Sequence, residues 1–343
     1  MTNPTMTQTH AHPRDIDDSL LRSWALPMPS GEGDKEVRGH VLILGGSREM
    51  PGAVILAATA AMRAGAGKLT IATGRSVAQL VALAIPESRV LGLAENEAGG
   101  FTVEAVAALD PLADKINAIL VGPGMQDEAA TARLVHALLP RLEGSNTSVL
   151  LDAEAMGAIL QPPDEAAANA NDQSDAKDDA AVNAPFRFNV PVLLTPHAGE
   201  MAHLTGIDKD AIQADPDRYA AEAAQRWNAV VALKGARTVI AAPNGERWQH
   251  EGGNVGLATS GSGDVLAGII AGLAARGADL AQAVSWGVAL HARAGVRLAE
   301  RLGTLGYLAR ELPDEIPALL EQAAGGKSAP ADRLSAHAGG SKG

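Results

Sequence analysis

The sequence predicts an α/β fold, in which a central, mostly parallel sheet is flanked by helices on both faces. Short β-branched or leucine-rich runs alternate with alanine-rich helical stretches from residue 39 to 160, and the alternation resumes at 191. Strands that alternate with helices of this length indicate parallel pairing under two helical layers. The 343 residues are within reach of one large α/β domain, and 46% hydrophobic residues suffice for its core.

Strands and helices follow one another along the chain. In the first half each predicted strand precedes a predicted helix: strand 41–46 precedes helix 53–65, strand 68–73 precedes helix 76–84, strand 118–124 precedes helix 128–142, and strand 148–153 precedes helix 154–160. After a strand near 191–195, residues 229–234 form another. The runs 238–242 and 246–250 flank the turn Pro243-Asn244-Gly245 and predict a hairpin. Helices are expected over 262–276, 279–302 and, more briefly, 312–323.

A leader and a tail are expected to flank a domain of residues 37–323, and an insertion is expected to interrupt it. Residues 1–36 are rich in Thr, Pro and charge and predict a flexible leader, and residues 324–343 predict a disordered tail. Residues 161–187 break the alternation with an acidic, alanine-rich stretch that has no apolar period. We interpret this stretch as a disordered surface insertion; a functional acidic tether is the alternative.

Composition excludes several classes of function. The net charge is −12 and no basic cluster occurs, which argues against nucleic acid and anionic membranes as partners. Cysteine is absent, which rules out disulfides, thiolate zinc sites and cysteine nucleophiles. The polar N-terminus has no apolar signal core and no apolar run is long enough to span a bilayer, so we expect a cytoplasmic protein.

The most informative segment is the loop Ser260–Val265, which leads directly into an apolar helix. The backbone N–H groups of Gly261, Ser262 and Gly263, together with the helix N-terminus, predict an anion hole for a phosphoryl group. Asp264 stands beside it. A carboxylate there can act as a general base on an attacking hydroxyl; the alternative is that Asp264 merely caps the helix.

Other candidate groups follow the predicted strands, at the sheet edge where ligands bind. Gly45–Ala53 is neither GxGxxG nor a P-loop, but Ala53 at the helix start can admit a ligand closely, if this is not a plain turn. The glycines around Pro123, including Gly124, permit unusual backbone close to a ligand, or a common turn. Asp152 can hold a metal or a hydroxyl, or cap the next helix.

Two later strand ends carry further candidates. His197 begins a helix without the HExxH pattern of zinc sites, so it is a binding histidine or a solvated one. In the segment Lys234–Thr238, Lys234 or Arg237 can neutralise a phosphate and Thr238 can donate a hydrogen bond; an ordinary hairpin with solvated charges is the alternative. His291 lies among apolar residues and is interpreted as a satisfied helix histidine.

Six motifs in one order, GGSREMPGA, VGPGM, LLDAEAM, LLTPHAGEM, LKGARTVI and LATSGSGDVLAGIIAGL, span residues 39–320. The chain thereby resembles the ADP-dependent NAD(P)H-hydrate dehydratases of the ribokinase-like superfamily. The resemblance implies a ribokinase-like fold and dehydration of the S epimer of hydrated NADH or NADPH (NADHX, NADPHX). ADP would be the co-substrate, and AMP and phosphate would be released. A small-alcohol kinase of the same superfamily, acting on a vitamin precursor, is the alternative.

The resemblance also implies roles for particular residues. The hydrated dinucleotide would be lined by Ala53, Gly124, His197 and Asp264, with Asp264 as catalytic base. The adenosine nucleotide would be bordered by Lys234, Gly235, Ala236, Arg237, Thr238 and Gly263. Mg²⁺, with unidentified ligands, a homotetramer and a separate upstream epimerase are further expectations. The chain departs from the family at Met50 (often aromatic), Glu154 (usually Asp) and Ser260 (usually Gly).

Overall fold

The computed structural model describes residues 12–28, 35–161 and 186–323, which share one ten-stranded sheet. Its order is β1-β10-β9-β8-β7-β6-β5-β2-β3-β4. Neighbouring strands are parallel except at β9, which runs antiparallel to both β8 and β10. The strands are β1 (Arg14–Asp15), β2 (His40–Leu44), β3 (Lys68–Gly74), β4 (Arg89–Leu93), β5 (Ala118–Val121), β6 (Ser148–Leu151), β7 (Val192–Leu194), β8 (Val230–Leu233), β9 (Arg237–Ala241) and β10 (Arg247–Glu251).

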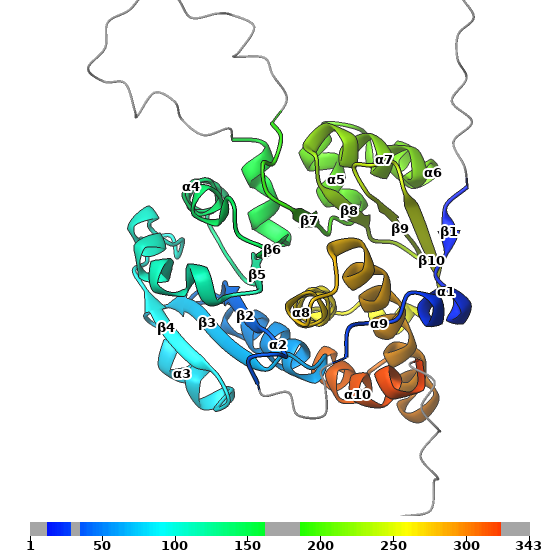
Figure 1. Ribbon diagram of the computed structural model, residues 1–343, viewed down its shortest axis with the longest axis horizontal. Coiled ribbons are helices and arrows are strands. Elements are labelled where there is room, and N and C mark those ends of the chain that lie inside the picture. The colour runs from blue at the N-terminus through cyan, green and yellow to red at the C-terminus, as the bar shows by residue number, and fades with distance from the viewer. Residues whose placement is uncertain (1–11, 29–34, 162–185, 324–343) are drawn as a thin grey trace, which may run out of the picture.

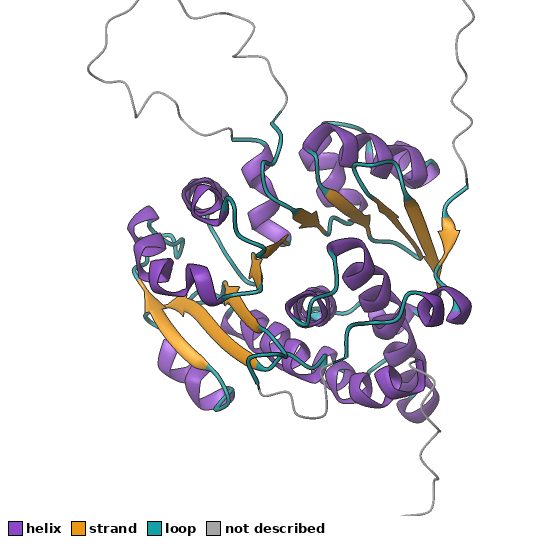
Figure 2. Cartoon of the chain, in the orientation of Figure 1, coloured by secondary structure: helices purple, strands orange, loops and turns teal. Residues whose placement is uncertain are grey.

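Helices cover both faces of this sheet (Figures 1 and 2), which confirms the predicted architecture. They are α1 (Asp18–Ser23), α2 (Pro51–Arg63), α3 (Ala78–Ala84), α4 (Glu128–Leu138), α5 (Ala198–Thr205), α6 (Lys209–Ala214), α7 (Pro216–Trp227), α8 (Ser262–Ala275), α9 (Leu280–Leu302) and α10 (Leu312–Ala323). The 3₁₀ segments are Val103–Lys115, Leu139–Leu142, Ala153–Ile159, Val255–Leu257 and Ala309–Glu311. No helix in these ranges has both the length and the apolar character needed to cross a bilayer.

The central strands are buried on both faces because successive side chains point to opposite sides of a sheet. In β2, Val41 and Ile43 join an apolar cluster with α2, α8, α9 and α10. Leu42 and Leu44 join a second cluster with α4, α5 and α7 on the other face. All four side chains are fully buried. The sheet therefore separates two cores.

Helix α8 lies deep in the first core and packs closely on α2. Most of its side chains are buried, so it is apolar around nearly its whole circumference. A Cβ at Gly268 would stand 2.2 Å from the carbonyl oxygen of Ala57, and one at Gly272 would stand 2.5 Å from that of Ala61. Glycine at these two positions lets the two backbones approach, and this fixes where the N-terminus of α8 meets the sheet.

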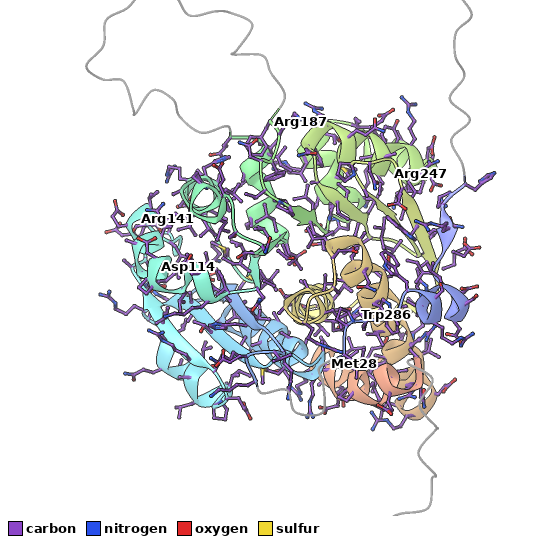
Figure 3. The ribbon with its side chains drawn as sticks, in the orientation of Figure 1. Met28, Asp114, Arg141, Arg187, Arg247 and Trp286 are labelled. Carbon is purple, nitrogen blue, oxygen red and sulfur yellow. The ribbon has the colours of Figure 1, made fainter. Side chains whose placement is uncertain are left out.

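The N-terminal segment departs from the expectation of a flexible leader. Residues 14–15 pair with β10, and Leu21 of α1 is fully buried. Trp24 stacks on Trp248 with ring centroids 5.4 Å apart, and its carbonyl accepts a 2.8 Å hydrogen bond from Trp286 Nε1. Figure 3 shows Trp286 among the helices beside this segment. The prediction was wrong for residues 12–28 because their apolar side chains complete the first core.

Further elements were not predicted. Strand β4 forms one edge of the sheet, and α6 and α7 occupy residues between 206 and 229 where no element was assigned. Asp215 accepts a hydrogen bond from Arg218 N and is followed by Pro216 in the first turn, which is a recognisable helix start. Strand β2 ends at Leu44 rather than 46, because Gly46 adopts a left-handed φ of 75°.

The predicted acidic insertion extends too far at its C-terminal end. Phe186 packs edge-on against buried Phe188, with ring centroids 4.8 Å apart, and Arg187 donates to the carbonyl of Gln225 at 2.8 Å. These residues therefore belong to the fold. The rest of the insertion from 162 to 185, leader residues 1–11 and 29–34, and the predicted tail 324–343 lie outside the described residues.

Candidate active site

Four titratable or polar groups meet where strands β6, β7 and β8 end and α8 begins. Asp152 directly follows β6, Thr195 follows β7 and Lys234 follows β8. Asp264 is in the first turn of α8. The carboxyl ends of neighbouring parallel strands lie at one edge of a sheet, so residues far apart in sequence come together there.

A buried carboxylate anchors this cluster. Asp152 Oδ1 accepts a hydrogen bond of 2.5 Å from Thr195 Oγ1 and lies 3.3 Å from Lys234 Nζ. Glu200 Oε2 lies 3.7 Å from the same ammonium. Burial acts to lower the pKa of Lys234, but the negative charges of Asp152 and Glu200 prevail and raise it. Lys234 is therefore a fixed positive charge at the sheet edge.

Asp264 is held in a state suited to a general base. It is half-buried, and burial together with the negative charge of Asp152 raises its pKa to about 6, against the opposing effect of Lys234. The carboxylate thus binds a proton far more readily than a solvated aspartate yet is ionised at neutral pH. Asp264 is not the N-cap residue of α8, because Gly261 occupies that position.

A cavity of about 820 Å³ reaches Lys234 and Gly263, the residue before Asp264, whereas Asp152, Thr195 and Asp264 do not themselves line it. Its walls include five of the six residues predicted to border the nucleotide: Lys234, Gly235, Ala236, Thr238 and Gly263. They also include His197, which was predicted to bind the dinucleotide. Its other walls come largely from residues 252–259 and from α9, and include the apolar side chains of Leu257 and Val288. A cationic group together with apolar walls fits a nucleoside phosphate.

Gly263 marks where a ligand can approach the backbone. A Cβ at this position would meet a single neighbour, Lys234 Nζ, at 3.9 Å. The protein itself therefore leaves space for a side chain at 263. Glycine is instead suited to the close approach of a bound anion to the first turn of α8, where N–H groups lack intrahelical partners.

Arg237 lies elsewhere. Its guanidinium donates to Asp217 Oδ2 at 2.8 Å and to Gln249 Oε1 at 2.7 Å, and Arg237 does not line the cavity. Alternate residues of β9 point to opposite sides of the sheet, so Thr238 faces the cavity and Arg237 does not. The structure thus places the Arg237 side chain away from this cavity, and its contact with a nucleotide stays a prediction.

Ala53 and Gly124 are close to one another but do not line this cavity. Gly124 has a left-handed φ of 64°, and a Cβ there would lie 2.8 Å from Ala53 Cβ and 2.5 Å from the carbonyl oxygen of Met50. Both positions therefore require small residues. Their predicted contact with the dinucleotide stays a prediction.

The anion loop differs from expectation at one amide. The N–H of Ser262 donates to the carbonyl of Thr259 at 3.2 Å, so it is not free to bind an anion. This turn is closed by Gly261, whose left-handed φ of 86° leads the chain into α8. Ser262 can contribute to an anion site through its hydroxyl instead, since the residue lines the cavity.

His197 caps a helix and also lines the cavity. Its Nδ1 accepts hydrogen bonds from the backbone N–H groups of Gly199 and Glu200, both at 3.0 Å, while Glu200 Oε2 accepts from His197 N at 2.7 Å. This reciprocal cap begins α5. With Nδ1 occupied as an acceptor, the neutral ring carries its proton on Nε2, which leaves a donor for a ligand at the cavity wall.

Sequence reasoning did not assign His291 to the site. His291 is satisfied by Ser262, whose Oγ lies 3.0 Å from His291 Nε2, but it also lines the cavity. Asn254 was missed as well; its Oδ1 accepts from Tyr307 Oη and Gly256 N. No motif or spacing links these partners, which are up to 53 residues apart and meet only in the fold.

A metal site made by the protein alone is not evident. Within residues 12–28, 35–161 and 186–323 no three acidic or histidine side chains converge as metal ligands. The buried carboxylate of Asp152 is already bound by Thr195 and Lys234. The residues present suit a divalent ion that enters on nucleotide phosphates and keeps its waters, as Mg²⁺ does in many phosphoryl-transfer sites.

Comparison with known proteins identifies the family. The family model described as NAD(P)H-hydrate dehydratase matches residues 41–318. The chain belongs to the NAD(P)H-hydrate dehydratase family. It is 46% identical over 309 residues to the ADP-dependent (S)-NAD(P)H-hydrate dehydratase of Xanthomonas campestris, with 90% of this chain and 96% of that protein covered.

Solved structures agree with the assignment. The ADP/ATP-dependent NAD(P)H-hydrate dehydratase of Bacillus subtilis, co-crystallised with ATP/Mg²⁺, is 30% identical with a TM-score of 0.71, covering 93% of this chain and 100% of that one. A ribokinase-like superfamily protein from Enterococcus faecalis is 24% identical with a TM-score of 0.71, covering 94% of this chain and 99% of that one. The predicted ribokinase-like fold is confirmed.

Proposed function

We propose that this member of the family dehydrates the S epimer of hydrated NADH and NADPH to restore the reduced dinucleotide, with ADP as co-substrate. The observation that carries the proposal is the half-buried carboxylate of Asp264 beside Lys234 and a nucleotide-sized cavity. Family membership identifies the substrate class, and the geometry supplies the groups that the chemistry requires.

The reaction needs a better leaving group than hydroxide. In the proposed mechanism, Asp264 removes the proton of the ring hydroxyl while the hydroxyl oxygen attacks the β-phosphorus of ADP, and AMP departs. The ammonium of Lys234 and the amides at the N-terminus of α8 stabilise the negative charge on the transferring group. Phosphate then leaves the ring carbon, pushed by the ring-nitrogen lone pair. Loss of a proton from the adjacent carbon restores the dihydronicotinamide.

We propose that Mg²⁺ accompanies the nucleotide. Bound to phosphate oxygens it would neutralise part of their charge. Among the residues of this chain, Lys234 and the first turn of α8 meet the phosphates directly. We assign the dinucleotide to His197, Asp264, Ala53 and Gly124.

The decisive experiment incubates the purified chain with hydrated NADH and with ADP or ATP, side by side. Loss of the hydrate with recovery of dihydronicotinamide absorbance, one AMP per turnover with ADP, and no stable phosphorylated product is the expected result. Accumulation of a phosphorylated alcohol would instead identify a kinase. Absence of turnover with either nucleotide would refute the proposal.

Three further expectations accompany this function. An S-specific dehydratase leaves the R epimer untouched, so we propose that a separate epimerase acts upstream. Stimulation of R-epimer consumption by an added epimerase tests this. We also propose a homotetramer, to be measured by light scattering after gel filtration, and a cytoplasmic location, to be measured by cell fractionation.

A further inference from the structure

Behind the anion loop lies a buried pair of side chains that the mechanism above does not use. Ser262 Oγ, on the first residue of α8, lies 3.0 Å from Nε2 of His291 on α9. Ser262 is 4% exposed and His291 is 9% exposed, yet both line the nucleotide cavity. The pair therefore connects the cavity wall to the first turn of α8.

The direction of this hydrogen bond decides what the serine can do. Burial lowers the pKa of His291 to about 4, so the ring is neutral at physiological pH and carries one N–H. A hydrogen bond with the backbone of Ser262 acts in the opposite sense and raises the pKa, but burial prevails. The 3.0 Å contact fits either tautomer; when the ring proton is on Nε2, the ring donates and Ser262 Oγ accepts.

An accepting Ser262 has its own hydroxyl proton available. Its backbone N–H is engaged by Thr259, so the hydroxyl is the group through which Ser262 can bind an anion. The hydroxyl stands at the helix N-terminus, next to Gly263 and its open approach. When a neutral imidazole N–H donates to one lone pair of the serine oxygen, it restricts rotation of that hydroxyl. The hydroxyl proton is then directed away from the ring.

We propose that His291 is a positioning residue. Its Nε2–H donates to Ser262 Oγ, and this orients the Ser262 hydroxyl proton toward the phosphoryl group that is held at the N-terminus of α8. The inference rests on the proposed function, because it requires a phosphoryl group in transfer at this place. It extends that function by assigning a side-chain donor to an anion site where the Ser262 amide is unavailable.

A merely structural role would have other consequences. Helices α8 and α9 pack against each other, and the Ser262–His291 bond joins them. If the bond served only this packing, its loss would lower thermal stability without a selective loss of kcat. Kinetic coupling between the two residues therefore separates the two roles.

The test compares steady-state kinetics of the full chain with its His291→Leu, His291→Gln, His291→Asn, Ser262→Ala and His291→Leu/Ser262→Ala variants, using hydrated NADH and ADP. His291→Leu should lower kcat roughly 10- to 100-fold, the usual range for a hydrogen bond to a charged group, with little change in KM for the hydrate. His291→Gln, whose amide nitrogen can reach the Nε2 position, should recover most of the rate, and His291→Asn should not. The double variant should be no slower than Ser262→Ala.

Ser285→Ala is the matched control. Ser285 is fully buried on the same helix α9, and its hydroxyl has no hydrogen-bond partner within the described part of the chain. Its removal should leave kcat unchanged. A near-wild-type kcat in His291→Leu, equal rates for the Gln and Asn variants, or losses that multiply in the double variant would each overturn the inference. Each of these results is obtained with a wild-type protein that is active. An inactive wild type would instead refute the proposed function itself.

Discussion

Replacing Asp264 with asparagine should abolish turnover and at the same time stabilise the fold. The side chain keeps its size and loses its charge. As the proposed general base, Asp264 contributes about 10²–10⁴-fold to the rate, so turnover should fall by that factor. Nucleotide binding should remain, because Lys234 and Gly263 are unchanged.

The gain in stability follows from the raised pKa. Burial and Asp152 raise the pKa of Asp264 from 3.8 to about 6, which corresponds to about 3 kcal/mol. In the unfolded chain Asp264 ionises around its ordinary pKa of 3.8, whereas in the folded chain it ionises only around pH 6. Above pH 6 the folded state therefore bears the full free-energy cost of a buried charge. Below about pH 4 the group is protonated in both states and the cost vanishes. The variant should thus gain up to about 3 kcal/mol at pH 8 and very little at pH 4.

Urea unfolding of both proteins at several pH values between 4 and 8 measures this difference. Asp127→Asn is a control of opposite sign: hydrogen bonds from Ala130 N and Asn96 lower the pKa of Asp127, so loss of its charge should destabilise the fold at neutral pH. Asparagine tolerates the left-handed φ of 64° and can still cap α4 through a neutral oxygen. A variant at 264 no more stable than wild type at pH 8, or one that retains turnover, would refute the reasoning.

Other predictions address the neighbouring groups and the N-terminal segment. The rate of the wild type should rise about tenfold per pH unit below pH 6 and level above it, as Asp264 loses its proton. Lys234→Met should lower kcat and move this midpoint to higher pH, because the ammonium opposes the rise in the pKa of Asp264; an unmoved midpoint would contradict that coupling. Gly263→Ala should keep or slightly raise the melting temperature but weaken nucleotide binding at least tenfold in calorimetric titration, since only a ligand competes for the space. Trp24→Ala should lower the free energy of unfolding by about 2 kcal/mol through loss of the stacking on Trp248, and should leave KM unchanged. This is less than the loss expected for a fully buried tryptophan. Equal urea midpoints for the variant and the wild type would show that the segment does not support the core.

Local pattern determined much of the fold. The boundaries of α8 and α9 agree with the expected ranges to within a few residues, because long apolar helices with clear ends carry their own signal. The segment Asp18–Trp24 carried a weaker signal, since a short helix at a polar terminus gains its stability from tertiary contacts such as Trp24 on Trp248. Strand β4 was likewise missed, at an edge where half-exposed residues dilute the strand pattern.

By itself the sequence determined the order of most strands and helices and, through six ordered motifs, the family, and it predicted Asp264 as a base beside an anion loop. The tertiary structure alone decided which of these residues meet. It joined Asp152 to Lys234 across 82 positions and Ser262 to His291 across 29, and it turned Arg237 toward Asp217. The physical reason is that a motif reports residues within one turn or loop, whereas a site depends on how separate strand ends and a buried helix are brought to one edge of the sheet.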